Sequence, residues 1–363
     1  MERKKSVGMV DFHYNLVSQP DGSAQKVIKT LLFNLKGWER YGFGVKGEGR
    51  LERRVEEGVH LFGVPENRFK NWLFNKLFRA GKFTYSRLVK LLNRYQPQIL
   101  HLHNRCELAD PLYSRLKYRP ILLCHYHRIF KEPIFPRNAV RFIGVSQFLA
   151  EVLKGQIDRE REKLVLSIPN PLPYDLLQFP RVNFRPIEGK YQLLFPFGDD
   201  QLKGFDIIPP FLKYLEERRI GYRFHLTGKV KGRLPEFFFT SPNISIYGHL
   251  SREEFYQLLS EVDFLLLPSR REAFSLVILE ALYLGTRPIV SEVGGIPEVV
   301  GEEYPFFISP HPSPPKILEQ LQRGAQLPPV QWRELADLIL FRFNPRKIVG
   351  QLEKLYISLL GGV

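Results

Sequence analysis

Residues 262–300 read VDFLLLPSRREAFSLVILEALYLGTRPIVSEVGGIPEVV, and this stretch decides the fold. A buried strand, a loop, a helical pattern and a second buried strand follow one another, and a glycine turn then opens another helix. Alternation of apolar strands with helices is typical of a parallel sheet that is covered by helices on both faces. The segment therefore predicts an α/β fold.

Two glutamates in this stretch lie eight positions apart. Glu272 falls in the loop and Glu280 inside the helix, whose N-terminus we place near Phe274, Ser275 and Leu276. The free backbone N–H groups of a helix N-terminus can hold an anion. A carboxylate on each side of such a cradle suits a ligand with hydroxyls at both ends and phosphates between them. A nucleotide sugar has this layout.

The same stretch resembles the retaining nucleotide-sugar glycosyltransferases of family 4, which are glycogen-synthase-like enzymes of the glycosyl transferases group 1. Their pattern is Pro-Ser, Glu, seven residues, Glu-Ala, Gly, Pro and Gly-Gly-x-Pro-Glu. The matching elements here are Pro268-Ser269, Glu272, Glu280-Ala281, Gly285, Pro288 and Gly294-Gly295-Ile296-Pro297-Glu298. The alternative interpretation is an ordinary βαβ unit with surface glutamates. The resemblance implies the GT-B fold, in which two Rossmann-like, doubly wound parallel-sheet domains face a cleft.

The rest of the chain also alternates strands with helices, and the proline-rich segment 169–186 is the best interdomain linker. We expect an N-terminal acceptor-side domain over residues 1–170 and a C-terminal nucleotide-sugar-binding domain over residues 171–344. A terminal helix within residues 345–363 should pack back on the N-terminal domain, as the resemblance implies. The N-terminal half carries looser matches to the family at Gly22-Ser23, Pro97–His103, Pro120–His127, Val145-Ser146 and Ile168-Pro169-Asn170.

The resemblance also assigns roles to residues at the donor. Glu280 would accept hydrogen bonds from the ribose, Glu272 from the donor sugar, and Lys203 would meet the diphosphate. The backbone that caps the diphosphate and sugar would come from Ala273, Phe274, Ser275 and Leu276, and Gly22 and Ser23 would face the diphosphate from the other domain. In the family a Gly-Arg ends the preceding strand, whereas this chain has Gly198-Asp199. The resemblance also implies that Gly198 lies at the donor. Candidates for the missing positive charge are Arg270, Arg271 and Arg287.

Catalysis would depend on positioning and charge stabilisation, with His127, Glu272 and Lys203 as the expected catalytic residues. The reaction passes through an oxocarbenium-like state, and in retaining GT-B enzymes the leaving phosphate is thought to deprotonate the acceptor. His127 is the first candidate to contact the donor sugar and His125 the second. Strand alternation puts both on one face, so periodicity does not choose between them. His13 and His125 are the acceptor-side candidates.

Two pairs of histidines also have metal-ligand character. His101-x-His103 and His125-x-His127 each end an apolar run, and Asp199-Asp200 is a second possibility. No carboxylate or cysteine cluster completes a set with recognisable spacing, and enzymes of this family generally need no metal for catalysis. We therefore expect no metal and no cofactor, with the nucleotide-diphosphate sugar as co-substrate.

Composition narrows the setting in which the protein works. Of 363 residues 44% are hydrophobic and 25% charged, which is ordinary for a soluble globular protein. No apolar run reaches the roughly 18–20 residues that span a bilayer. Only two cysteines, Cys106 and Cys124, are present, which fits buried thiols in a reducing compartment. We therefore expect a cytoplasmic protein.

The net charge of +15 lies in the first half of the chain, where residues 1–170 contain 31 Lys and Arg against 16 Asp and Glu. Residues 65–95 interleave basic and aromatic side chains. This stretch is either an interfacial segment for an anionic membrane surface or a helix with a core face and a solvated basic face. We expect a glycan or lipid-linked acceptor and peripheral binding at the inner face of the plasma membrane. No nucleic-acid motif accompanies the charge, so no nucleic acid is expected.

The leading hypothesis is a retaining glycosyltransferase that moves a hexose-type sugar from a nucleotide-diphosphate sugar to a hydroxyl of a glycan, lipid-linked or envelope acceptor. The alternative is a catalytically degenerate GT-B scaffold that acts as a binding protein, which Asp199 motivates. A nucleic-acid-binding protein is a third hypothesis, which rests on the charge alone.

Overall fold

The computed structural model describes residues 4–12, 16–17, 22–46, 49–65 and 85–361. The chain forms two compact units, one of Met1–Asp175 with Asn344–Val363 and one of Leu176–Phe343. The candidate His13 and residues 66–84 of the basic-aromatic stretch lie outside the described residues.

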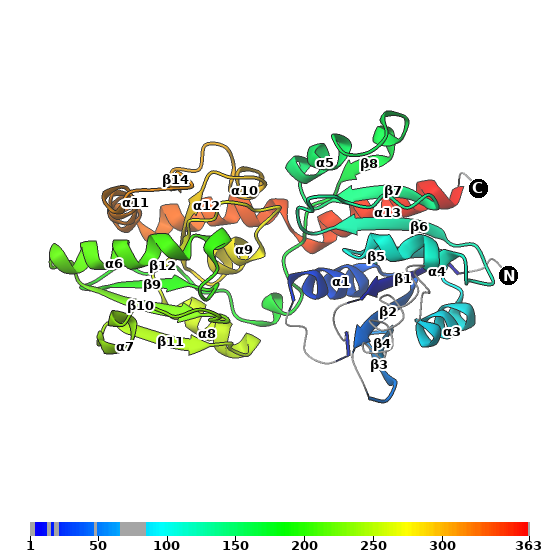
Figure 1. Cartoon of the computed structure of the whole chain (residues 1–363), viewed down its shortest axis with the longest axis horizontal. Helices are drawn as coiled ribbons and strands as arrows, with labels where there is room; N and C mark the ends of the chain where they lie inside the picture. Colours follow the sequence, from blue (N-terminus) through cyan, green and yellow to red (C-terminus); the bar gives the residue numbers. More distant parts are fainter. Residues whose placement is uncertain (1–3, 13–15, 18–21, 47–48, 66–84, 362–363) are drawn as a thin grey trace. The chain divides into compact units, whose positions relative to one another are not determined.

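The described residues of unit 1 form an eight-stranded sheet in the order β3-β4-β2-β1-β5-β6-β7-β8 (Figure 1). Neighbouring strands run parallel except β3, which pairs antiparallel with β4. The central strands are buried along their whole length, as apolar runs predict for a sheet covered on both faces. The strands are β1 (Ser6–Asp11), β2 (Glu39–Lys46), β3 (Glu52–Glu56), β4 (Val59–Pro65), β5 (Ile99–His103), β6 (Ile121–Tyr126), β7 (Ala139–Gly144) and β8 (Val165–Ser167).

The α-helices in the part of unit 1 that the structure describes are α1 (Ser23–Asn34), α3 (Ser86–Tyr95), α4 (Ala109–Tyr113), α5 (Gln147–Lys154) and α13 (Pro345–Gly361). Ser146 caps α5 by accepting the Leu149 N–H at 3.0 Å, which confirms the predicted N-cap. The terminal helix α13 follows unit 2 in sequence but packs against α1 of unit 1. The indole of Trp38 anchors it by donating to Glu353 at 2.8 Å.

Unit 2 has a six-stranded, all-parallel sheet in the order β11-β10-β9-β12-β13-β14. Its strands are β9 (Tyr191–Phe195), β10 (Tyr222–Thr227), β11 (Ile244–Gly248), β12 (Phe264–Leu267), β13 (Arg287–Ser291) and β14 (Phe307–Ile308). Its α-helices are α6 (Ile208–Glu217), α7 (Phe237–Thr240), α8 (Arg252–Glu261), α9 (Leu276–Tyr283), α10 (Ile296–Val300), α11 (Pro314–Gln326) and α12 (Pro329–Arg342).

Both sheets are doubly wound, which confirms the predicted fold class. In unit 2 helix α6 packs on α11, whereas α8 and α12 both pack on α9, and Figure 1 shows helices on both sides of the sheet. The chain runs outward from β9 to β11 and then restarts at β12 on the other side of β9. The strand order therefore reverses between β9 and β12. In open α/β sheets, ligands bind at such a point, outside the carboxyl ends of the strands.

A histidine in unit 2 makes stability depend on pH. His225 on β10 is buried, with Nδ1 2.9 Å from the Tyr247 hydroxyl and Nε2 3.2 Å from Gln192. Burial, and secondarily the charge of Arg223, lower the pKa of His225 to about 4. The unfolded chain, with a histidine pKa near 6.5, therefore binds more protons between pH 6.5 and 4, and folding loses stability as the pH falls through this window.

We expect the stability advantage of the wild type over His225→Gln to shrink by about 1 kcal/mol between pH 7.5 and 5, after allowance for solvent screening. Urea unfolding of both chains at the two pH values measures the difference. An advantage that stays constant with pH would contradict the assignment.

Candidate active site

The candidate site lies at the point in unit 2 where the strand order reverses. The loop after β9 carries Lys203 and the loop after β12 carries Glu272. Because β9 and β12 are parallel neighbours, their carboxyl ends lie together, and the two side chains meet with Lys203 Nζ 2.5 Å from Glu272 Oε1. The Ser269 hydroxyl donates to the same oxygen at 3.3 Å. Two residues that the sequence separates by almost 70 positions thus form one ion pair.

The ion pair is mostly withdrawn from water. Glu272 is 8% exposed, and the Lys203 side chain is 24% exposed with its ammonium 4.9 Å from the centre of the Phe197 ring. Burial raises the pKa of Glu272, and the charge and hydrogen bond of Lys203 oppose that shift. Both contacts use Oε1 of Glu272, so Oε2 is the oxygen that a ligand hydroxyl can reach.

A glycine pair fixes the loop that carries Glu272. The Gly295 N–H donates to the Glu272 carbonyl at 3.0 Å. Gly294 has φ +57°, and a Cβ there would lie 2.0 Å from the same carbonyl oxygen. Only glycine fits this close approach. The Gly-Gly element of the sequence motif therefore positions the glutamate that precedes it by more than 20 residues.

Helix α9 begins directly after the loop, with Ser275 as its N-cap residue, which confirms the predicted helix start. The Ser275 side chain does not cap the helix, so its first backbone N–H groups lack that partner. The flanking Phe274 ring packs edge-on against Phe343, with the ring centres 5.4 Å apart. The residues predicted to cap a diphosphate with their backbone are 5–8% exposed, and they are Ala273, Phe274, Ser275 and Leu276.

Glu280 lies one turn into α9 and is 3% exposed. It accepts a hydrogen bond from the Tyr256 hydroxyl at 3.1 Å. Tyr256 lies on α8, which packs on α9. Sequence reasoning missed this tyrosine, since inside a helix it is indistinguishable from a core aromatic residue.

Asp199 stands where the family has an arginine, and backbone N–H groups of the same chain bind its carboxylate. The Asp199 carboxylate accepts the N–H groups of Lys231, at 2.9 Å, and of Gly232, and these bonds lower the pKa of Asp199. Gly198, also a predicted donor-site residue, has φ +58°, and a Cβ there would lie 2.1 Å from the Lys229 carbonyl oxygen. Gly198 and Asp199 therefore join the loop after β9 to the loop after β10.

The three arginines considered as replacements lie in different surroundings. Arg287 opens β13 at its amino end, 1% exposed, with its guanidinium about 6 Å from the rings of Phe264 and Trp332. Burial lowers the pKa of Arg287 to about 10. Arg270 pairs with Asp206 at 2.7 Å. Arg271 is exposed and directly precedes Glu272, which makes it the best placed of the three to meet a phosphate.

The remaining predicted residues belong to unit 1. Gly22 is the N-cap of α1 and Ser23, which is exposed, its first residue. His125 is the second-last residue of β6 and is 1% exposed. His127 follows the strand, is partly exposed, and has its Nε2 2.8 Å from His103 Nδ1. Burial lowers the pKa of His127 to about 3, so its ring is neutral at pH 7. Only His127 of the two offers surface to a ligand.

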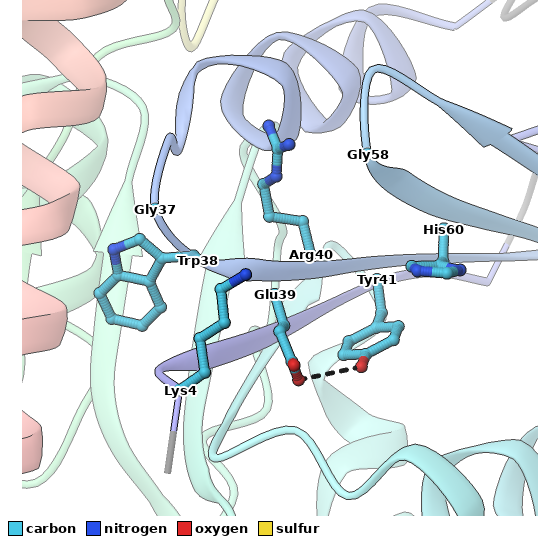
Figure 2. A pocket seen from close by; sticks show the side chains of 8 residues that line it. All are labelled: Lys4, Gly37, Trp38, Glu39, Arg40, Tyr41, Gly58 and His60. Carbon is cyan, nitrogen blue, oxygen red and sulfur yellow. Dashed lines mark hydrogen bonds between the residues drawn. The ribbon is translucent and has the colours of Figure 1, made fainter. Parts of the chain in front are cut away.

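Unit 1 also contains a cavity of about 320 Å³, which Figure 2 shows. Lys4 precedes β1, Glu39 opens β2 and His60 lies near the start of β4, so the cavity lies at the amino ends of the strands. Arg40 turns away from it and donates to the carbonyls of Leu32 and Phe33 at 3.0 and 3.3 Å. The cavity is therefore at the wrong end of the sheet for the ligand site of a doubly wound fold.

The glycine turn gives a direct test of how Glu272 is positioned. Gly294→Ala should destabilise the protein by at least about 2 kcal/mol, because the backbone angle and the clash with the Glu272 carbonyl both oppose the new Cβ. Gly189→Ala is the matched control, since Gly189 also has a positive φ, +71°, but nothing within 4 Å of the added Cβ. Denaturant unfolding measures both. Equal losses in the two variants would show that the contact with Glu272 carries no cost.

Comparison with known proteins places these features in context. Residues 188–330 match the family described as "Glycosyl transferases group 1". An uncharacterized 41.2 kDa protein in the cps region of Klebsiella pneumoniae is 31% identical over 59% of this chain and 66% of its own length. An uncharacterized glycosyltransferase of Methanocaldococcus jannaschii is 24% identical over 51% of this chain and 49% of its own length. The matches thus span two thirds or less of these curated relatives.

Solved structures share the fold over nearly the whole chain. Sucrose-phosphate synthase from Thermosynechococcus elongatus has a TM-score of 0.68 at 17% identity, covering 99% of this chain and 100% of that one. The catalytic domain of starch synthase IV from Arabidopsis thaliana has a TM-score of 0.71 at 14% identity, covering 98% and 99%. WaaG, a glycosyltransferase involved in lipopolysaccharide biosynthesis, has a TM-score of 0.66 at 16% identity, covering 96% and 99%. These likenesses establish the GT-B fold that the sequence predicted.

Proposed function

We propose that this chain, whose residues 188–330 belong to the glycosyl transferases group 1 family, is a retaining glycosyltransferase. It transfers a hexose-type sugar from a nucleotide-diphosphate sugar to a hydroxyl of a glycan, lipid-linked or envelope acceptor. The observation that carries the proposal is the buried Lys203–Glu272 pair beside the start of α9. It supplies a cation and a sugar-binding carboxylate at the ligand-binding edge of a doubly wound sheet.

Each group of this site has a task that suits its surroundings. Glu280, already oriented by Tyr256, accepts from the ribose hydroxyls, and Oε2 of Glu272 accepts from the donor sugar. The backbone N–H groups at the start of α9 receive the diphosphate. Lys203, 2.5 Å from Glu272, stabilises the negative charge that grows on the leaving diphosphate.

The reaction follows from this charge arrangement. The bond between the anomeric carbon and the phosphate oxygen breaks through an oxocarbenium-like state. The acceptor hydroxyl attacks on the same face and gives its proton to the leaving phosphate. We propose that His127, neutral and partly exposed, contacts the donor sugar, and that transfer requires no metal ion at the diphosphate, since Lys203 and the helix N-terminus supply the positive charge.

The setting of the acceptor rests on charge and on the relatives. The whole net charge of +15 belongs to residues 1–170, which suits an anionic or lipid-linked acceptor. One relative is encoded in a cps region, and WaaG is involved in lipopolysaccharide biosynthesis. None of the described helices is both long and apolar enough to cross a membrane. We therefore propose a cytoplasmic enzyme that binds peripherally at the inner membrane face, where its acceptor is assembled.

A degenerate scaffold that only binds is the second candidate function, and Asp199 is its motivation. The structure weakens that motivation, because the Asp199 carboxylate is occupied by the Lys231 and Gly232 N–H groups. Donor hydrolysis or transfer over a panel of acceptors distinguishes the two functions. Nucleotide binding without any turnover across the panel would favour the scaffold.

A thermal-shift screen of UDP-, GDP- and ADP-sugars at low salt tests the donor site. A ligand at 100 times its Kd should stabilise by about 2.7 kcal/mol and raise Tm by a few degrees. We expect one base to give this shift, and Glu280→Ala to abolish it. Glu217→Ala, an exposed glutamate on α6, is the control and should keep it. A shift that survives in Glu280→Ala would place the nucleotide elsewhere.

Arg271 is proposed to supply the charge that the family arginine provides. Arg271→Gln should weaken binding of the matching nucleoside diphosphate about tenfold, as expected for one lost charge-assisted hydrogen bond. Arg218→Gln removes the same charge from the exposed end of α6 and should leave Kd unchanged. Isothermal titration measures both. Equal affinities in all three chains would exclude Arg271 from the phosphate site.

A further inference from the structure

Histidines from two neighbouring strands of unit 1 converge on one point. His101 and His103 lie on β5 and His125 on β6, with His103 in register with His125. Residues two apart on a strand, and register partners on parallel strands, face the same side of a sheet. The ring centres lie 4.5 Å apart for His101 and His103, and 5.2 Å apart for each of these and His125.

The three rings are sealed from water, and their nitrogens lack partners on the inner side. Each side chain is 0–1% exposed. His101 Nδ1 lies 2.6 Å from the Tyr356 hydroxyl and His103 Nδ1 lies 2.8 Å from His127 Nε2. Within the described residues, Nε2 of His101 and Nε2 of His103 are buried without a hydrogen-bond partner, and the ring of His125 has no partner but the backbone of Ile168. Buried polar atoms are nearly always paired, so this set needs an explanation.

We propose that His101, His103 and His125 are the ligands of a buried divalent metal ion of the kind that Zn²⁺ represents. One nitrogen of each histidine lies within 4.8 Å of one nitrogen of both others. Imidazole nitrogen is a preferred ligand of late first-row metals, and a single ion satisfies three nitrogens that otherwise have no partner.

The outward hydrogen bonds set the ring tautomers that a metal requires. If Nδ1–H of His101 donates to Tyr356 and Nδ1–H of His103 donates to His127, each Nε2 directs its lone pair inward. Metal-bound histidines commonly donate their other N–H to such a partner, which orients the ring.

Metal binding requires the rings to move and rotate, and a negative charge lies nearby. Tetrahedral Zn²⁺ with bonds of about 2.0–2.1 Å places its nitrogens roughly 3.3 Å apart. The ring planes now lie 7–32° from parallel and the candidate nitrogens within 4.8 Å of one another, so the rings must approach by up to about 1.5 Å and turn toward the ion. Asp11 ends β1 in register with His103 and is 3% exposed. The carboxylate of Asp11, on the strand next to β5, would offset part of the charge of a buried cation. The fourth position is left for a water molecule.

The proposed ion lies within unit 1, whereas Lys203, Glu272 and α9 lie in unit 2, and its role is structural. Through His103 it would also orient His127, which we propose contacts the donor sugar. The ion would tie β5 to β6 and, through Tyr356, to the terminal helix α13. The sequence favoured no metal because no carboxylate or cysteine completed either His-x-His pair. Register between parallel strands, which local spacing does not reveal, places the two pairs side by side.

Co²⁺ titration of the full chain, purified without a polyhistidine tag and stripped with EDTA, tests the proposal. We expect one equivalent of Co²⁺ to bind with visible absorption bands of a low-coordinate site, Zn²⁺ to displace it, and Zn²⁺ to raise Tm. His125→Phe should bind none. His225→Phe, which removes a buried histidine of unit 2, should bind the same equivalent as the wild type.

Absence of these bands in the wild type, or their persistence in His125→Phe, would overturn the proposal. If His125→Phe does not fold, His101→Gln and the loss and recovery of Tm in the wild type on EDTA and Zn²⁺ treatment decide the question. The nucleotide affinity of unit 2 should be the same with and without EDTA. Failure of the metal site is therefore distinguishable from failure of the donor site.

Discussion

The buried ion pair of Lys203 and Glu272 is the interaction on which the candidate site depends. Burial raises the pKa of Glu272, and the nearby ammonium of Lys203 opposes this rise. The lysine therefore helps to keep the carboxylate ionised, so that it can accept hydrogen bonds. Removing Lys203 would leave an uncompensated charge on the buried Glu272, which is strongly destabilising. The surrounding backbone serves this pair, since the Gly294-Gly295 turn holds the Glu272 loop and α9 starts beside it.

Local sequence patterns predicted the parts of the site that local structure determines. The apolar runs of 262–300 specified β12 and β13, and Ser275 was correctly placed at the start of α9. Local sequence patterns did not predict the long-range contacts of the site. The partner of Glu280 on α8, and the backbone groups that hold Asp199, come from elements brought together by the sheet topology. The choice between His125 and His127 likewise depends on burial at a strand end, which alternation cannot supply.

The two halves of the chain differ in net charge. Residues 171–363 are neutral overall, because the +15 of the chain already arises in residues 1–170. In the proposed function, donor recognition in unit 2 therefore rests on a few fixed groups and not on a general electrostatic field. Unit 1 contains neutral histidines, the buried His101 and the partly exposed His127, within a strongly basic polypeptide. Such a field attracts anionic surfaces and acceptors, and the buried rings contribute no charge to it.

Hydrogen–deuterium exchange with and without the matching nucleoside diphosphate tests the central claim most directly, because it locates the ligand on the chain. The account predicts that protection concentrates in the backbone of residues 273–276 and in the loop of residues 198–204. Protection confined to the cavity lined by Trp38 and His60, with residues 273–276 unchanged, would contradict it.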